Sequence, residues 1–283
     1  MGSPMKALLL ALLTVATASA FTVNDRLGLQ MYSLRVQAMQ QGWRPALAQA
    51  KAFGFAAIEG GLPANVTVEQ YKAEIASRGL RLVSAGYGYD ALAKDIAGAV
   101  AQARALGVQY VMVAWIPHED DTFTAEEATK AAADFNAWGA AFRAAGITFT
   151  YHPHGYEFRP LPGGGNLFDS IVRSTNPDFV SFEMDVFWVT HGGQDPVKLL
   201  EKYPDRWRLV HVKDIRKGAS THIYTGHAPA TDDVPVGSGQ VDWPSVFREA
   251  KTVGVQWFFI EDESVTPMQN IPQSVSYIRS LGL

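Results

Sequence analysis

Short runs of β-branched and aromatic residues alternate along the chain with longer amphipathic segments, a pattern typical of repeated strand–helix units. Glycine often precedes the next strand, as at Gly54, Gly79, Gly107 and Gly146, because it readily adopts the left-handed conformation that ends a helix. The expected strands cover residues 27–33, 55–60, 80–87, 109–115, 147–152, 179–185, 207–212 and 256–262. The expected helices cover residues 44–53, 67–78, 90–106, 124–145, 166–175, 195–203, 242–253 and 271–281. This order predicts an α/β protein, a (βα)8 TIM barrel that forms a single domain.

The length of the chain agrees with this fold, because residues 21–283 suffice for one barrel and contain no obvious linker. A doubly wound sheet is the alternative. It is less favoured because residues 27–33, Leu-Gly-Leu-Gln-Met-Tyr-Ser, are not followed by a glycine-rich dinucleotide fingerprint. The longest irregular stretch, residues 214–241, follows the seventh expected strand. A loop of this length at the catalytic end of a barrel is expected to shape or cover a site.

The N-terminus resembles a secretory signal peptide. Lys6 precedes a short apolar stretch, and Ala18-Ser19-Ala20 matches a signal-peptidase cleavage site. A membrane anchor or an additional N-terminal helix is the alternative, and Met1–Pro4 resembles a cloning remnant. We therefore expect residues 1–20 to be removed, and residues 21–283 to be exported to a bacterial periplasm without membrane attachment.

Composition narrows the choice of function. The chain has no cysteine, which excludes disulfides, thiolate metal ligands and a cysteine nucleophile. Its net charge of −4 argues against a nucleic-acid partner, which a basic surface would normally indicate. Apolar residues make up 47% and charged residues 18% of the chain, values typical of a globular protein with a large core.

Four polar residues, Glu157, Asp185, His211 and Glu261, each follow or end a different expected strand. A parallel barrel brings such positions together at one rim, where three carboxylates and an imidazole would suit a divalent metal ion. Taken singly, each has an ordinary alternative: Asp185 as a helix cap, His211 as a core residue, Glu157 as a solvated loop residue. Their occurrence at the same rim favours a joint site.

The chain resembles the xylose-isomerase-like TIM barrel superfamily, the sugar phosphate isomerase/epimerase group. The similarity rests on the order of several short motifs, found in residues 29–35, 57–59, 151–158, 184–185, 211–214, 236–243 and 260–262. This resemblance implies that Glu157, Asp185, His211 and Glu261 bind one Mn²⁺, Mg²⁺, Co²⁺ or Zn²⁺. It also implies that Glu157 and Glu261 act as a catalytic acid/base pair on opposite faces of a sugar.

Further residues are candidates for binding the sugar. Lys213, His152 and His154 are plausible partners of sugar oxygens, although a solvated Lys213 and a structural His152 are equally plausible. The aromatic residues are candidates for stacking on a sugar ring or for core packing, and Glu59 for binding substrate or bracing a loop. The candidate substrate-binding residues are His152, His154, Lys213, Tyr32, Trp115, Trp188 and Glu59.

The leading functional hypothesis is a metal-dependent isomerase or epimerase of a neutral carbohydrate. It would remove a proton next to a carbonyl and form an enediolate. The main alternative is a lyase that eliminates the aglycone of a 3-keto-glycoside, which export would favour. Two departures count against simple ketose epimerisation: Trp188 stands where several ketose epimerases have histidine, and Val-Lys-Asp follows His211.

Less favoured hypotheses are an AP endonuclease-like enzyme and a non-catalytic sugar-binding barrel. The sequence also allows a homo-oligomer, because aromatic residues are concentrated at 182–188 and 257–259.

Overall fold

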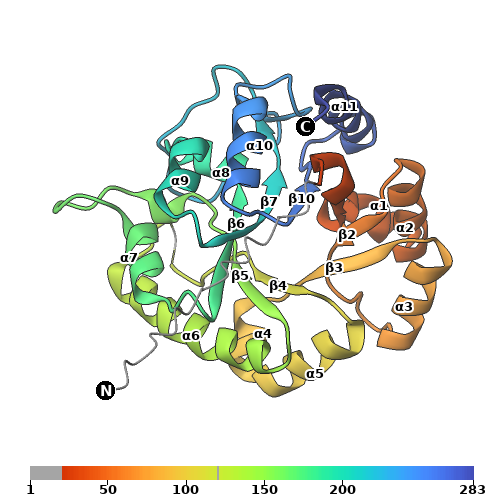
Figure 1. Ribbon diagram of the computed structural model, residues 1–283, viewed down its shortest axis with the longest axis horizontal. Helices are drawn as coiled ribbons and strands as arrows, with labels where there is room; N and C mark the ends of the chain where they lie inside the picture. Colours follow the sequence, from red (N-terminus) through yellow and green to blue (C-terminus); the bar gives the residue numbers. More distant parts are fainter. Residues whose placement is uncertain (1–20, 120) are drawn as a thin grey trace, which may run out of the picture.

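The computed structural model describes residues 21–119 and 121–283. Eight parallel strands form a closed barrel in the order β1-β10-β7-β6-β5-β4-β3-β2, and helices surround it (Figure 1). The strands are β1 (Leu27–Gln30), β2 (Ala57–Glu59), β3 (Arg81–Gly86), β4 (Tyr110–Val113), β5 (Thr148–Tyr151), β6 (Val180–Asp185), β7 (Trp207–Val212) and β10 (Trp257–Ile260). The predicted fold is therefore confirmed; the expected signal peptide lies outside the described residues.

The helices follow the expected alternation, with some divided into two. They are α1 (Arg35–Gln41), α2 (Trp43–Ala52), α3 (Val68–Ser77), α4 (Tyr89–Lys94), α5 (Ile96–Leu106), α6 (Ala125–Ala144), α7 (Leu167–Ser174), α8 (Val186–His191), α9 (Pro196–Lys202), α10 (Trp243–Thr252) and α11 (Pro267–Leu281). Short 3-10 helices cover Val23–Arg26 (η1), Met31–Leu34 (η2) and Tyr156–Phe158 (η3). The long loop after β7 contains a two-stranded antiparallel sheet, β8 (Asp214–Ile215) and β9 (Asp233–Val234).

Alternation along the strands separates the helix-facing side of the barrel from its interior. On β5, the rings of Phe149 and Tyr151 lie 5.4 and 4.7 Å from that of Phe135 on α6. Thr150 and His152 therefore face inward.

One end of the interior is filled by an apolar layer of Ala57, Val83, Leu209, Trp257 and Phe259. The ring of Phe259 reaches so close to β1 that a Cβ on Gly28 would lie 2.6 Å from it, which explains the glycine. Two residues further along the same faces of β2, β7 and β10 the interior becomes polar, with Glu59, His211 and Glu261. The alternation thus places the functional groups directly on top of an apolar floor.

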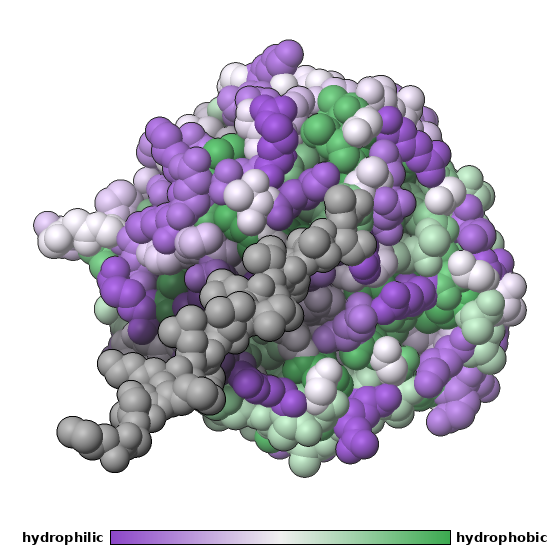
Figure 2. Space-filling model, in the orientation of Figure 1, coloured by the Kyte–Doolittle hydropathy of each residue, from purple (hydrophilic) through white to green (hydrophobic). Residues whose placement is uncertain are grey.

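The aromatic residues at 182–188 and 257–259 are buried in the barrel and under its helices. Polar side chains are spread around the rim of the face seen in Figure 2, with smaller apolar areas between them. In the described part of the chain, no helix combines the length and apolarity needed to cross a bilayer.

Candidate metal centre and substrate cavity

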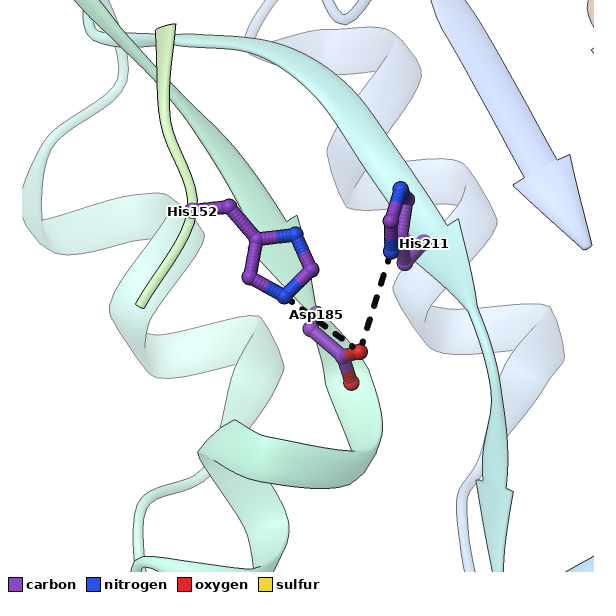
Figure 3. A group of neighbouring side chains, drawn as sticks. All are labelled: His152, Asp185 and His211. Atoms are coloured by element: carbon purple, nitrogen blue, oxygen red, sulfur yellow. Dashed lines mark ion pairs between the residues drawn. The ribbon is translucent and has the colours of Figure 1, made fainter. Parts of the chain in front are cut away.

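Three side chains from neighbouring strands converge at the open end of the barrel: His152 after β5, Asp185 at the end of β6 and His211 on β7 (Figure 3). Asp185 Oδ2 lies 3.6 Å from His152 Nε2 and 3.8 Å from His211 Nδ1. All three residues are at most 1% exposed, and none of these three atoms has a hydrogen-bond partner. Buried polar atoms normally have a hydrogen-bond partner. Three such atoms without a partner, each able to bind a metal and all close together, fit a metal ion.

The other nitrogen of each imidazole faces a buried glutamate. His211 Nε2 donates to Glu59 Oε1 at 2.6 Å, and His152 Nδ1 lies 3.4 Å from Glu183 Oε2. A carboxylate on the far nitrogen orients a metal-binding histidine and leaves the lone pair of the near nitrogen for the ion. Glu59 is held in turn by Gln30 Nε2 at 2.7 Å. Both imidazoles are therefore arranged as metal ligands.

Glu261 completes the group from the end of β10. Its Oε2 lies 3.3 Å from His211 Nδ1 and 3.6 Å from Lys213 Nζ. The set of side chains able to hold a cation is therefore His152, Asp185, His211 and Glu261. Since its two imidazoles favour a transition metal, Zn²⁺, Co²⁺ or Mn²⁺ fits better than Mg²⁺, which prefers oxygen ligands.

The charges in this buried cluster are unevenly compensated. Burial raises the pKa of Asp185 to about 7. Burial tends to lower the pKa of His211, but Glu183, Glu261 and Glu59 outweigh it and raise the pKa well above 6.5. Burial, together with the Glu59 carboxylate, also raises the pKa of Glu183. A bound cation would compensate the excess negative charge of these carboxylates.

Glu157, expected among the metal ligands, is not brought to this group. Tyr151 faces the helices rather than the barrel interior, and its hydroxyl donates to Glu157. The same carboxylate accepts a hydrogen bond from the backbone N of His154 at 3.1 Å. Glu157 is buried in η3 and does not line the cavity. The place at the end of β5 that we assigned to Glu157 is taken by His152.

Replacing Glu157 with Gln is expected to leave metal affinity unchanged but to alter the pH dependence of stability. Burial raises the pKa of Glu157 from 4.5 to about 7, so the folded protein retains a proton that the unfolded chain loses. Stability from this group is present at low pH and is lost as pH rises from about 4.5 to about 7. The free energy of unfolding, measured with urea at several pH values in this range, should therefore fall less steeply with rising pH in Glu157→Gln than in the wild type. The expected difference is about 1.4 kcal/mol per pH unit. An identical slope, or loss of metal binding, would contradict this placement.

A second variant tests the orientation of His211. Glu59→Gln removes the charge that fixes the His211 tautomer while preserving the size of the side chain. We expect the dissociation constant for Zn²⁺, measured by calorimetry, to rise about 10- to 100-fold. Glu69→Gln, on the exposed surface of α3, is the control; equal affinities in the two variants would show that Glu59 does not orient the ligand.

A cavity of about 530 Å³ is lined by three of the four side chains, His152, His211 and Glu261. His152, His154, His211 and Glu261 form its polar end, and Tyr32, Trp115 and Trp188 contribute aromatic surface. His154 Nδ1 and Trp188 Nε1 are buried without a partner, so both can hydrogen-bond a polar ligand. Burial lowers the pKa of His154 to about 3, which keeps its imidazole neutral. The cavity thus suits an uncharged ligand with several oxygens.

Two of the residues expected to bind substrate, Lys213 and Glu59, lie outside the cavity and contact residues of the site instead. Lys213 is 1% exposed and does not line this cavity; its Nζ contacts Glu261 and Glu263 and lies 5.2 Å from the centre of the Trp188 ring. Burial tends to lower the pKa of Lys213, but the Glu261 and Glu263 carboxylates outweigh it and raise the pKa. Glu59 lies below the metal ligands rather than in the cavity.

The loop after β7 also reaches the cavity, as its length suggested. Gly226 lines the cavity with a φ of +71°, and a Cβ there would lie 2.7 Å from the ring of Trp115. The sequence did not identify Gly226, Gln30 or Glu183 as parts of the site. For Glu183 a signal existed, since it shares a strand face with Asp185.

Comparison with known proteins gives a consistent classification. A family model for the xylose isomerase-like TIM barrel matches residues 47–281. An inosose dehydratase from Mesomycoplasma hyopneumoniae (strain J) is 28% identical over 172 residues, 56% of this chain and 56% of the relative. The chain thus aligns with little more than half the length of this curated relative.

Two solved structures share the fold. A sugar phosphate isomerase/epimerase from Parabacteroides distasonis ATCC 8503 has a TM-score of 0.72 and 25% identity, covering 93% of this chain and 96% of that one. A structure of the IolI protein with a bound zinc atom has a TM-score of 0.68 and 14% identity, with coverages of 90% and 97%. Because the family model extends over most of the barrel, this chain belongs to the xylose isomerase-like TIM barrel family.

Proposed function

We propose that this protein is a divalent-metal-dependent enzyme that removes a proton next to the carbonyl of a cyclic keto-sugar and then eliminates the substituent β to that carbonyl. The observation that carries the proposal is the convergence of unpartnered His152 Nε2, Asp185 Oδ2 and His211 Nδ1 beside Glu261. A divalent ion held there would supply a Lewis acid that stabilises negative charge developing on a carbonyl oxygen.

The proton acceptor that we assign is Glu261. Burial tends to raise its pKa, but Lys213 and His211 outweigh that effect and lower the pKa below 4.5. Its carboxylate is therefore ionised at neutral pH and lines the cavity. Lys213 is a positioning residue, since its Nζ lies 3.6 Å from Glu261 Oε2 and outside the cavity. His154, neutral and with an unpartnered nitrogen, is placed to hydrogen-bond the departing oxygen.

Elimination is favoured over epimerisation by the position of Glu157. Epimerisation by two carboxylates requires one on each face of the sugar, and Glu157 was the expected second carboxylate. Its Oε1 accepts hydrogen bonds from the Tyr151 hydroxyl and from the His154 backbone N, and Glu157 does not line the cavity. Among the relatives, the name dehydratase also describes an elimination.

NMR in D₂O tests the proposal directly. Metal-loaded protein would be mixed with a 3-keto-glucoside and, separately, with free ketoses. Release of the C1 substituent with an unsaturated sugar product supports elimination. Deuterium incorporated next to the carbonyl, with the sugar skeleton intact, would instead support isomerisation or epimerisation, and absence of both with metal bound would contradict proton removal from these substrates.

A further inference from the structure

A second groove of about 420 Å³ opens beside the substrate cavity, between the loops that follow β1 and β10. The two hollows share Arg35 and Glu263. Its apolar wall includes Val36 on α1, Val265, and Met268 at the start of α11. Since β1 and β10 are neighbours in the barrel, these loops form one continuous rim next to the candidate metal centre.

The exposed large hydrophobic side chains of the described residues are concentrated at this rim. Tyr32, Val36, Met39, Val265 and Met268 are 53%, 50%, 77%, 80% and 42% exposed. Val36, Val265 and Met268 line the groove, and Tyr32 lines the neighbouring cavity. Isolated exposed hydrophobic residues are common on protein surfaces, but a group of them around a hollow is typical of a binding surface.

The charged groups between the two hollows are already engaged. The Arg35 guanidinium lies 4.4 Å from the centre of the Tyr32 ring and donates to the backbone oxygens of Tyr32 and Glu263 at 3.0 and 3.3 Å. The Glu263 carboxylate pairs with Lys213. The groove therefore offers apolar side chains and the uncharged amides of Gln37, Gln40 and Gln41, and its two charged residues are already engaged. The stacked Arg35–Tyr32 pair lies at its border with the substrate cavity, which Tyr32 lines.

We propose that this groove binds an uncharged aryl group attached to the sugar, so that the substrate is an aryl keto-glycoside. The inference rests on the proposed elimination and names the group that leaves. The proton next to the ketone passes to Glu261, and its bonding electrons form a C=C bond. The C1–O bond to the aryl group breaks, and its electron pair stays on the oxygen. That oxygen takes up a proton from solvent water, and Glu261 returns to solvent the proton that it removed. The products are an unsaturated keto-sugar and a phenol, with no change in overall oxidation state.

Binding can be measured separately from turnover with two unoxidised probes, 4-nitrophenyl β-D-glucoside and methyl β-D-glucoside. In calorimetry on the metal-loaded protein, we expect the aryl glucoside to bind about tenfold more tightly, the gain from burying about 55 Å² of apolar surface. The double variant Val265→Ser/Met268→Ser should lose this preference and keep its affinity for the methyl glucoside. Met39→Ser is the matched control, because Met39 is exposed on the same rim but does not line the groove.

Equal affinity for the two glucosides, or no binding of either, would overturn the inference. It would also be overturned if light scattering showed that the double variant separates a dimer while the aryl preference is unchanged, since the groove would then be a contact between two copies. An aryl preference without elimination in the NMR experiment would leave the groove assignment standing and reject the proposed reaction.

Discussion

Asp185→Asn is expected to abolish turnover and to weaken Zn²⁺ or Mn²⁺ binding by more than about 100-fold, a larger loss than we expect from Glu59→Gln. The substitution removes the negative charge of Asp185, whose Oδ2 faces both His152 Nε2 and His211 Nδ1. The asparagine oxygen can still accept the hydrogen bond from Trp188 N, now 3.0 Å from Asp185 Oδ1, so α8 should keep its cap. Metal binding would be measured by calorimetry and turnover by NMR.

Asp195→Asn is a matched control for this variant. Asp195 also caps a helix, accepting hydrogen bonds from Val197 N and Lys198 N at 2.9 and 3.3 Å, but it lies on the surface outside the site. We expect wild-type affinity and turnover in this control. Retention of metal affinity in Asp185→Asn would remove Asp185 from the site.

Lys213→Met is expected to lower the free energy of unfolding by about 3–5 kcal/mol, because it leaves Glu261 and Glu263 without their buried cation. It should also abolish turnover, since Glu261 is no longer held ionised against the cavity. The matched control is Lys202→Met. Lys202 pairs with Asp169 at 2.7 Å but has a side chain that is 51% exposed, so its loss should cost less than about 1 kcal/mol.

Urea unfolding and turnover would be measured for both lysine variants. An equal effect of the two substitutions would show that burial of Lys213 has no special importance. Full activity in Lys213→Met would show that Glu261 does not depend on it.

The barrel was predictable because strand and helix periodicities are local properties of the sequence. The positions of Asp185, His211 and Glu261 were also predictable, since each belongs to a strand whose alternation is clear. The orientation of the side chains at the end of β5 was not predictable. Tyr151 and His152 are both compatible with a strand interior, and only packing of the Tyr151 ring against Phe135 decides which of them faces inward.

Whether Tyr151 faces the helices or the barrel interior determines the role of Glu157. With Tyr151 facing the helices, the chain turns through η3 and carries Glu157 toward the Tyr151 hydroxyl. The roles of Glu59 and Gln30 depend on how β1 and β2 are placed against β7 in the closed barrel. Contacts between strands so distant in sequence cannot be read from local patterns.

The metal site can be located in a crystal of the protein soaked with Co²⁺, through an anomalous difference map. We expect one strong peak between His152 Nε2, Asp185 Oδ2 and His211 Nδ1, with Glu261 within coordination distance. A peak at Glu157, or no peak in the barrel at saturating Co²⁺, would contradict this placement of the metal.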